Sequence, residues 1–470
     1  MIQRALVWLR RDLRLDDHAA LSAAEAENSS VAIVFVFDRT ILDDLTDPND
    51  RRITYILESL RELDTKLRTR GSQLIVRSGD PVVEIPRLTA ALGARAVYAS
   101  RDYEPYARRR DATVHEALQA QGRALQLYRD QLVVEPHEIR NQQGYPYRVF
   151  TQYKNTWLRL VNHDRFAAYP TSLRKLQPAR DIDAVSLPLA YATAGFQPSA
   201  SLTVSPGAAA AQQRLRDFLA RDLTHYHEAR DRPAMDATSG LSVHLRFGTL
   251  SVRECFRALL DQEPGSQGTE MFRSELIWRE FFQMILGEFP HVVDGCFQRQ
   301  YDRIPWPGSE AHFEAWCDGR TGYPLVDSAM RCLRATGTMH NRLRMVVASF
   351  LVKDLLIDWR RGEAWFARWL LDYDLAANNG GWQWCASTGC DAQPYFRIFN
   401  PVRQSERYDP QGDYIRRWLP ELADLPATHI HWPWHHPAAR QHARSANYPE
   451  PIVDHAIQRQ LALRLYKGCR

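Results

Sequence analysis

The chain has few cysteines and no long hydrophobic run. Its seven cysteines include no CxxC pair, and their spacing is irregular. This pattern is typical of reduced thiols in a cytoplasm, so neither structural disulfides nor a cysteine-based zinc site is expected. No apolar stretch approaches the roughly 20 residues that cross a bilayer, and Arg10-Arg11 is not followed by the hydrophobic segment of an export signal. These absences predict a cytoplasmic protein without a membrane span or a metal site.

A strong excess of either charge is also missing. The 60 Lys and Arg residues nearly balance the 56 Asp and Glu residues, which leaves a formal net charge of +4. So small an excess predicts no general affinity for polyanions, and contact with nucleic acid would need a local basic surface. The 470 residues, 45% of them hydrophobic, are enough for two or three globular domains.

The first 130 residues alternate between short apolar runs and helical patterns. The apolar runs are rich in β-branched and aromatic residues and occupy 5–9, 31–37, 73–76 and 95–99. Helix-spaced apolar residues fill 51–71 and 107–122. This alternation predicts a Rossmann-like parallel sheet covered by helices on both faces. No GxGxxG follows the first run, so this domain is not expected to hold the main cofactor.

The rest of the chain divides into a proline-rich stretch and a helical one. Prolines recur from Pro136 to Pro206, which predicts a long connection over the surface. After Ala208, helix-spaced apolar residues fill 211–222, 250–261, 270–288, 324–335, 341–357 and 362–371. The predicted fold is therefore an α/β domain over 1–130, an interdomain linker over 131–205 and an all-helical domain over 206–470.

Residues 372–384, DYDLAANNGGWQW, combine carboxylates, amides, glycines and tryptophans. Because Asp, Asn and Gly disfavour a helix interior, this segment is poorly explained as a core helix. One interpretation is a polar wall built against a flat, hydrogen-bonding ring system. The alternative is a helix that ends at 378–381 with a glycine cap, followed by a helix with buried tryptophans.

Three other segments carry residues suited to ligand binding. Hydroxyl and backbone N–H groups of TSGLS (238–242) can hold phosphate, or simply cap the helix that follows. Glu275 and Trp278 share one helical face, as in a site for a flat polar ring or in a helix with one buried indole. The arginines of MHNRLRM (339–345) suit phosphate or a partner carboxylate, and a solvated first turn is the alternative.

In their order along the chain, these segments resemble the DNA photolyase/cryptochrome family. The resemblance covers almost the whole chain and rests on LVWLRRDLRLDDHAAL (6–21), TSGLS (238–242), LIWREFF (276–282), TGYPLVDSAMR (321–331), MHNRLRMVVASFLVKDLLIDWR (339–360), DLAANNGGWQW (374–384) and FRIFNP (396–401). It implies the fold predicted above, with FAD bound in the helical domain and reduced when active. The family's flavin contacts are matched by Tyr226, Thr238, Ser239, Gly240, Leu241, Ser242, Arg279, Asn341, Arg344, Asp372, Asp374 and Asn378.

The resemblance also implies roles for individual residues. Arg344 and Asp372 are expected to form a buried charge pair beside the flavin, and Asn378 to face its N5 atom. The family's chain for photoreduction of oxidised flavin is matched, from the flavin to the surface, by Trp382, Trp359 and Trp306.

Substrate positions narrow the resemblance to the class I cyclobutane pyrimidine dimer photolyases. Their pocket is matched by Glu275, Trp278, Asn341, Met345 and Trp384. In the other branches, (6-4) photolyases and animal cryptochromes have histidine in the HNRLRM region, plant cryptochromes tend to have aspartate at the Asn341 position, and DASH-type cryptochromes have Gln and Tyr at the positions of Met345 and Trp384. The candidates for contact with the DNA backbone are Lys154, Arg230, Arg342, Arg397 and Gln404.

The implied function is light-driven repair of UV-damaged DNA by a monomer without an obligate protein partner. Reduced FAD absorbs a blue photon and donates an electron to a flipped-out dimer, which splits and returns the electron. Trp278 and Trp384 are expected to flank the dimer, and Glu275 to stabilise its radical anion. The alternative is a cryptochrome-type blue-light receptor without repair activity, although no long, low-complexity tail follows FRIFNP.

Three positions depart from the usual family pattern. Thr338 stands where many relatives have Trp, and Tyr373 replaces a common Gly. In the α/β domain, RDYEPYARRRD (101–111) lacks the Asn-Glu pair of folate-binding relatives. Deazaflavin is therefore expected as the antenna chromophore in preference to methenyltetrahydrofolate, with contacts from Arg52, Asp102 and Glu104.

Overall fold

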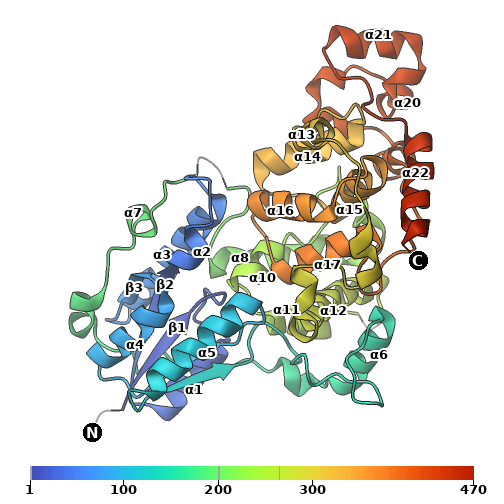
Figure 1. Cartoon of the computed structure of the whole chain (residues 1–470). Coiled ribbons are helices and arrows are strands. Elements are labelled where there is room, and N and C mark those ends of the chain that lie inside the picture. The colour runs from blue at the N-terminus through green and yellow to red at the C-terminus, as the bar shows by residue number, and fades with distance from the viewer. Residues whose placement is uncertain (1–2, 200–201, 264, 470) are drawn as a thin grey trace. The chain divides into compact units, whose positions relative to one another are not determined.

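The computed structural model describes residues 3–199, 202–263 and 265–469, which form two compact units. Unit 1 consists of Met1–Pro146, Tyr153–Leu223 and Ser239–Gly287, and unit 2 of Tyr147–Gln152, Thr224–Thr238 and Glu288–Arg470. All described strands lie in unit 1, and the described part of unit 2 consists of helices and loops (Figure 1). No described cysteine forms a disulfide. Among the described residues, no helix combines the length and the apolar character needed to cross a bilayer.

Unit 1 contains a parallel five-stranded sheet in the order β3-β2-β1-β4-β5. Its strands are β1 (Arg4–Leu9), β2 (Ser30–Asp38), β3 (Leu74–Gly79), β4 (Ala96–Ser100) and β5 (Ala124–Tyr128). The central strand β1 is almost entirely buried, and its Val7 lies opposite Ile33 of β2 and Tyr98 of β4. The predicted α/β fold is confirmed, and the edge strand β5 is an addition to the four predicted runs.

Helices connect the strands and continue beyond them. Those of unit 1 are α1 (Ala19–Glu27), α2 (Arg39–Leu42), α3 (Arg51–Arg68), α4 (Pro81–Ala91), α5 (Pro105–Gln119), α7 (Tyr191–Ala194), α8 (Ala208–Arg221), α10 (Ser242–Phe247), α11 (Val252–Leu260) and α12 (Gln267–Glu288). Helices α4 and α5 pack against one face of the sheet, where Leu88 and Val114 join Leu6 and Val34 in a single core.

The proline-rich stretch also contains a regular helix, α6 (Phe150–Leu160), where the sequence predicted an irregular connection. Tyr153 and Trp157 are buried and lie four residues apart on one helical face. Tyr153 packs on Phe281 of α12 with ring centroids 5.3 Å apart, and the Trp157 indole N–H donates to the Glu280 carboxylate at 2.7 Å. These contacts explain why the helix forms despite the prolines on either side of it.

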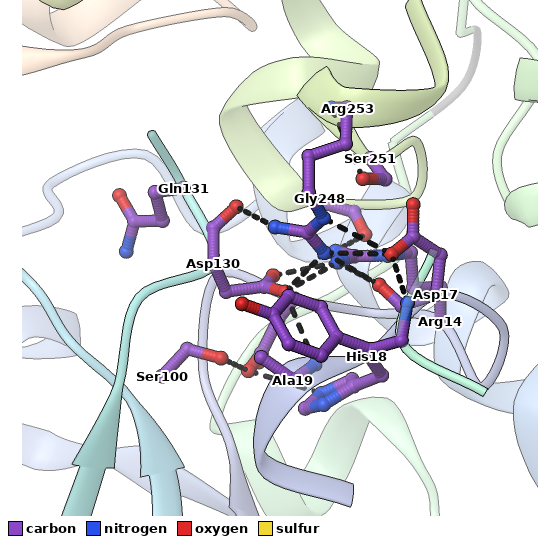
Figure 2. Close-up of polar contacts among 12 residues, drawn as sticks. Arg14, Asp17, His18, Ala19, Ser100, Asp130, Gln131, Gly248, Ser251 and Arg253 are labelled. Carbon is purple, nitrogen blue, oxygen red and sulfur yellow. Dashed lines mark hydrogen bonds and ion pairs between the residues drawn. The ribbon is translucent and has the colours of Figure 1, made fainter. Parts of the chain in front are cut away.

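A buried cluster of charges joins three stretches of unit 1 that are far apart in the sequence. We call it the Asp130 cluster, and it consists of Arg14, Asp17, Asp130, Arg253 and Arg257. Arg14 and Arg253 donate to the Asp130 carboxylate at 2.6 and 2.9 Å, and Arg253 also donates to Asp17 at 2.9 Å (Figure 2). Arg257 donates to the other oxygen of Asp17 at 2.8 Å. The cluster holds α11 against the loop that follows β1.

The guanidinium groups of this cluster keep its carboxylates ionised. Burial alone would raise the pKa of Asp130, but Arg14 and Arg253 lower it far below its ordinary value. The same opposition holds at Asp17, where burial is outweighed chiefly by Arg253, and the pKa of Asp17 is lowered. Both carboxylates are therefore charged at neutral pH, and each depends on an arginine of α11.

Unit 2 is helical and has a core rich in aromatic residues. Its helices are α9 (Tyr226–Ala229), α13 (Glu310–Cys317), α14 (Pro324–Thr336), α15 (Asn341–Ser349), α16 (Trp359–Trp369), α17 (Leu375–Ala386), α18 (Pro401–Tyr408), α19 (Asp413–Trp418), α20 (Ala427–Ile430), α21 (Pro437–Ser445) and α22 (His455–Gly468). The main core collects side chains of α13 to α17, including Trp316, Trp359 and Trp382.

A single helix was predicted over 341–357, but α15 ends at Ser349 and a π-helical turn follows over Phe350–Asp354. Two ionisable side chains of this turn, Lys353 and Asp354, are buried in the core. The Lys353 amine donates to the Ser387 hydroxyl at 3.1 Å, and the Asp354 carboxylate contacts His455 at 2.5 Å. Each of the two buried side chains therefore has a polar partner from another helix or loop of unit 2.

The expectation that 372–384 is no core helix was wrong, because α17 runs through the paired amides and glycines without a break. The amides do not compete with the helix backbone, since they bond to neighbouring segments. Asn378 donates to the Glu363 carbonyl at 3.1 Å, and Asn379 donates to the Val292 carbonyl at 2.9 Å. Asp374 caps the first turn by accepting from the Ala377 N–H at 3.1 Å.

Candidate functional site

Several candidate residues of unit 1 lie on α12 or next to it. Glu275 and Trp278 are half-buried and one turn apart, as the sequence predicted for a shared face. The Trp278 ring packs on Phe281 and Phe282, with centroids 5.5 and 5.4 Å away. The Lys154 amine of α6 donates to the Ser274 hydroxyl at 3.1 Å, which places this cation next to the turn that carries Glu275.

The loop 238–242 leads into α10 and depends on the glycine at its centre. Gly240 has a φ of +63°, and a Cβ at this position would lie 2.9 Å from the Arg214 Nε atom. Arg214 donates from that atom to the Ser239 carbonyl at 2.8 Å. The close approach of Arg214 to Gly240 therefore comes from a hydrogen bond that supports the loop. Ser239 is half-buried and Ser242 exposed, which leaves hydroxyl groups of the loop accessible to a ligand.

Arg279, also on α12, was predicted to contact the flavin. One of its nitrogens donates to the Gln131 carbonyl at 2.6 Å, and the other approaches the Leu245 carbonyl at 3.5 Å. Arg279 thus supports the chain that follows β5 and the short helix α10. Its contact with a flavin stays a prediction.

In unit 2, the first turn of α15 presents Asn341, Arg342, Arg344 and Met345 in succession. His340 caps this turn, because its Nδ1 atom accepts from the Arg342 N–H at 3.1 Å. Burial lowers the pKa of His340 to about 4, so the ring is neutral at physiological pH and its Nδ1 atom stays free to accept. The Asn341 amide lies 4.0 Å from the Met345 sulfur, which confirms that the two share a face. Sequence reasoning missed this role of His340.

The predicted pair of Arg344 and Asp372 is present, with two contacts of 2.9 and 3.1 Å. The Asp372 side chain is only 5% exposed, whereas that of Arg344 is 29% exposed. Arg344 also donates to the Met339 carbonyl at 2.8 Å, which fixes its guanidinium group from a second side. The paired side chains of Arg344 and Asp372 are therefore held in place, carry opposite charges and are partly open to solvent, next to the start of α17.

Helix α17 places Asn378 and Asn379 against Glu363, a residue that sequence reasoning did not single out. The Glu363 carboxylate accepts from the Asn379 amide at 3.0 Å, while its backbone carbonyl accepts from Asn378. Burial raises the pKa of Glu363 to about 7. Nothing in the local sequence marks Glu363, because its partners come from the next helix.

The remaining candidates of unit 2 are more scattered. Arg230 lies over the ring of Tyr226 at 5.7 Å, and Arg342 pairs with Asp231 at 2.9 Å. Trp384 is half-buried against the main core, and Arg397 is exposed. Thr238 and Gln404 are half-buried.

The three predicted electron carriers differ in exposure. Trp359 and Trp382 are 0% and 2% exposed, whereas Trp306 is half-buried. A Cβ at Gly362 would come within 2.1 Å of the Trp382 ring. The missing side chain of Gly362, one turn after Trp359, therefore lets Trp382 pack directly on the helix that carries Trp359. Trp382 and Trp359 are thus both buried, and only Trp306, the last member of the predicted order, is partly exposed to solvent.

The predicted antenna residues of unit 1 are held by other charges. Arg52 pairs with Asp50 at 2.5 Å, and Glu104 pairs with Arg11 at 2.7 Å. Burial raises the pKa of Asp102, but Arg11 and other nearby arginines outweigh it and lower that pKa. Asp102 and Glu104 come directly after the carboxyl end of β4, and ligands of such sheets usually bind at this edge.

Two protein-family models match most of the chain. Residues 5–172 match the family model for DNA photolyase, and residues 272–468 match the model for the FAD binding domain of DNA photolyase. A deoxyribodipyrimidine photo-lyase of Vibrio cholerae is 41% identical, over 99% of this chain and 99% of its own.

Solved structures give the same result. A bacterial class III photolyase from Agrobacterium tumefaciens has a TM-score of 0.87 and is 35% identical, covering 100% of this chain and 98% of its own. A cryptochrome from Synechocystis sp. has the same TM-score at 28% identity, covering 99% of both chains. The predicted helical FAD-binding domain is thus confirmed, and the chain belongs to the DNA photolyase/cryptochrome family.

Proposed function

We propose that this protein uses light to repair cyclobutane pyrimidine dimers in DNA. The observation that supports this most directly is the half-buried pair of Glu275 and Trp278 on one face of α12, with Lys154 beside the same turn. An indole stacks on a pyrimidine ring, and an adjacent carboxyl group can hydrogen-bond to the polar edge of that ring. A neighbouring cation suits a DNA phosphate.

The residues present fit FAD, which supplies an electron to the dimer when it is bound, reduced and excited by blue light. The accessible hydroxyl groups of the loop 238–242, with Gly240 at its turn, suit the pyrophosphate. The rigid pair of Arg344 and Asp372 suits the polar edge of the ring system. Asn378 would present its amide to flavin N5, with its nitrogen already held by Glu363.

The substrate residues then have distinct roles. Trp278 and Trp384 each stack on the flipped-out dimer, and Asn341 and Met345 contact it. Glu275 hydrogen-bonds to the dimer and stabilises its radical anion. The DNA backbone is contacted by Lys154, Arg230, Arg342, Arg397 and Gln404, so affinity for DNA falls steeply with salt.

Blue light should remove thymine dimers from an oligonucleotide incubated with the purified, chemically reduced holoenzyme, and darkness should not. Chromatography of the oligonucleotide would measure the dimer content. The similarity to a cryptochrome favours a blue-light receptor as the second candidate. If FAD is bound and reduced and yet light removes no dimer, the repair proposal is wrong and the receptor takes its place.

Replacing Glu275 with alanine should lower the number of dimers repaired per absorbed photon by at least about threefold, because a group that stabilises developing charge is lost. The absorbance of bound FAD should stay at the wild-type level. Glu270 lies on the same helix and pairs with Arg273 at 2.8 Å, so Glu270→Ala is the matched control. An unchanged yield in Glu275→Ala would refute the role assigned to this carboxyl group.

We further propose deazaflavin, in preference to methenyltetrahydrofolate, as the antenna chromophore near Arg52, Asp102 and Glu104. The missing Asn-Glu pair in 101–111 supports this choice. Mass spectrometry of the chromophores released from the holoenzyme identifies the second one. The protein would act in the cytoplasm as a monomer without an obligate protein partner.

A further inference from the structure

We propose that Arg360 directs electron transfer along the tryptophans of unit 2 by making a positive charge on Trp359 unfavourable. This inference rests on the proposed tryptophan chain. In that chain, Trp382 gives an electron to photoexcited oxidised FAD, Trp359 refills Trp382, and Trp306 refills Trp359. The electron vacancy must reach Trp306 before the transferred electron returns, so the middle position decides the outcome.

Arg360 is fixed over the ring of Trp359. Its guanidinium carbon lies 4.9 Å from the ring centroid, and Trp359 is wholly buried, so water does not separate the two. The guanidinium group pairs with Asp302 at 2.7 Å and with Asp358 at 3.0 Å. Asp302 is itself held by the Cys296 N–H at 2.9 Å, and Asp358 caps α16 by accepting from the Arg360 N–H at 3.0 Å. The cation is thus anchored from two sides.

The charges around Trp359 determine the sign of the effect. Arg360 contributes one positive charge, and Asp302 and Asp358 contribute two negative charges. Removal of the positive charge alone leaves two carboxylates near a buried ring, which makes a positive charge on Trp359 more favourable. The vacancy would then stay on Trp359, and return of the electron would compete with the transfer from Trp306.

The two end members have different surroundings. Trp382 packs among the rings of Phe366 and Trp316, with centroids 5.0 and 6.1 Å away. A positive charge there is poorly solvated, which favours its departure. Trp306 is half-buried, so water can solvate the charge and accept the indole proton that the radical cation releases. An unfavourable positive charge on Trp359 therefore completes a path along which the electron vacancy moves outward, from Trp382 to Trp306.

Transient absorption of the holoenzyme with oxidised FAD tests the proposal, because a deprotonated Trp306 radical is long-lived. In Arg360→Gln, which keeps hydrogen-bond donors but no charge, the yield of this radical per absorbed photon should fall roughly tenfold. Arg360→Lys keeps the charge and should recover most of the yield. Arg361 lies over Phe313 at 3.9 Å, so Arg361→Gln is the matched control and should behave as the wild type.

Equal radical yields in Arg360→Gln and the wild type would overturn the proposal. It would also fail if Arg360→Lys recovered nothing while the melting temperature and FAD content fell in both variants, since the role would then be purely structural. Asp302→Asn independently tests the sign of the electrostatic effect on Trp359. It removes a negative charge, so the vacancy should leave Trp359 faster, and slower departure would contradict the proposal.

A different variant tests whether the proposed series of tryptophans carries electrons at all. If Trp306→Phe photoreduces its flavin at the wild-type rate, the tryptophan chain itself is wrong, whatever Arg360 does. Dimer repair by the chemically reduced wild-type protein tests the proposed repair activity separately, because that flavin has already been reduced.

Discussion

Replacing Arg253 with methionine is expected to lower the free energy of unfolding of unit 1 by about 3–5 kcal/mol, the usual cost of breaking a buried ion pair from one side. Arg253 is 2% exposed and bonds to both carboxylates of the Asp130 cluster. Methionine fills a similar volume, so the loss reflects uncompensated charge more than a cavity. Denaturant unfolding, followed by circular dichroism, measures the difference.

The matched control for this change is Arg221→Met. Arg221 forms an exposed pair with Asp217 at 3.9 Å, and its loss should cost less than about 1 kcal/mol. A similarly small loss for Arg253→Met would show that water or a rearranged Arg14 compensates Asp17 and Asp130. The Asp130 cluster would then contribute little to the stability of unit 1.

Replacing Arg344 with methionine should weaken FAD binding at least about tenfold, which corresponds to 1.4 kcal/mol. The change leaves the Asp372 carboxylate 5% exposed and without its guanidinium partner, next to the proposed flavin edge. Stability should also fall by about 3 kcal/mol, near the lower end for a buried pair, because Arg344 itself is partly exposed. The absorbance of FAD retained by the purified protein, and titration with added FAD, measure the loss.

Two further variants separate binding from folding in that experiment. Arg368→Met removes an exposed cation of α16 and should retain FAD. Arg344→Met combined with Asp372→Leu removes both charges and should recover stability without recovering FAD. Wild-type FAD affinity in Arg344→Met would show that the charge pair does not serve the cofactor.

Most of the fold could be predicted because buried strands and helices have recognisable patterns of apolar residues in the sequence. The four predicted strands are continuous apolar runs, as a sheet covered on both faces requires. β5 escaped notice because its residues, apart from Leu125, are only half-buried at the edge of the sheet. α6 was missed because prolines on either side outweighed the helical spacing of Tyr153 and Trp157.

Local propensity failed where partners come from elsewhere in the chain. Asn378 and Asn379 disfavour a helix only while their amides are unpaired, and Glu363 and Val292 pair them. The candidate site residues were assigned largely through the family resemblance. Arg360 and His340 act through neighbours that spacing does not reveal, and the structure was needed to place them.

The Asp130 cluster also determines when unit 1 can be completed during protein synthesis. Asp17 is made 236 residues before Arg253. At the usual 5–20 residues per second, that interval lasts roughly 12–50 s. Throughout it, Asp17 lacks the arginines of α11, and Asp130, once it is made, has only Arg14 of the three arginines of the cluster as a partner. The N-terminal sheet is therefore the first part of the chain to leave the ribosome, but it acquires its last ion pairs only after α11 has been made.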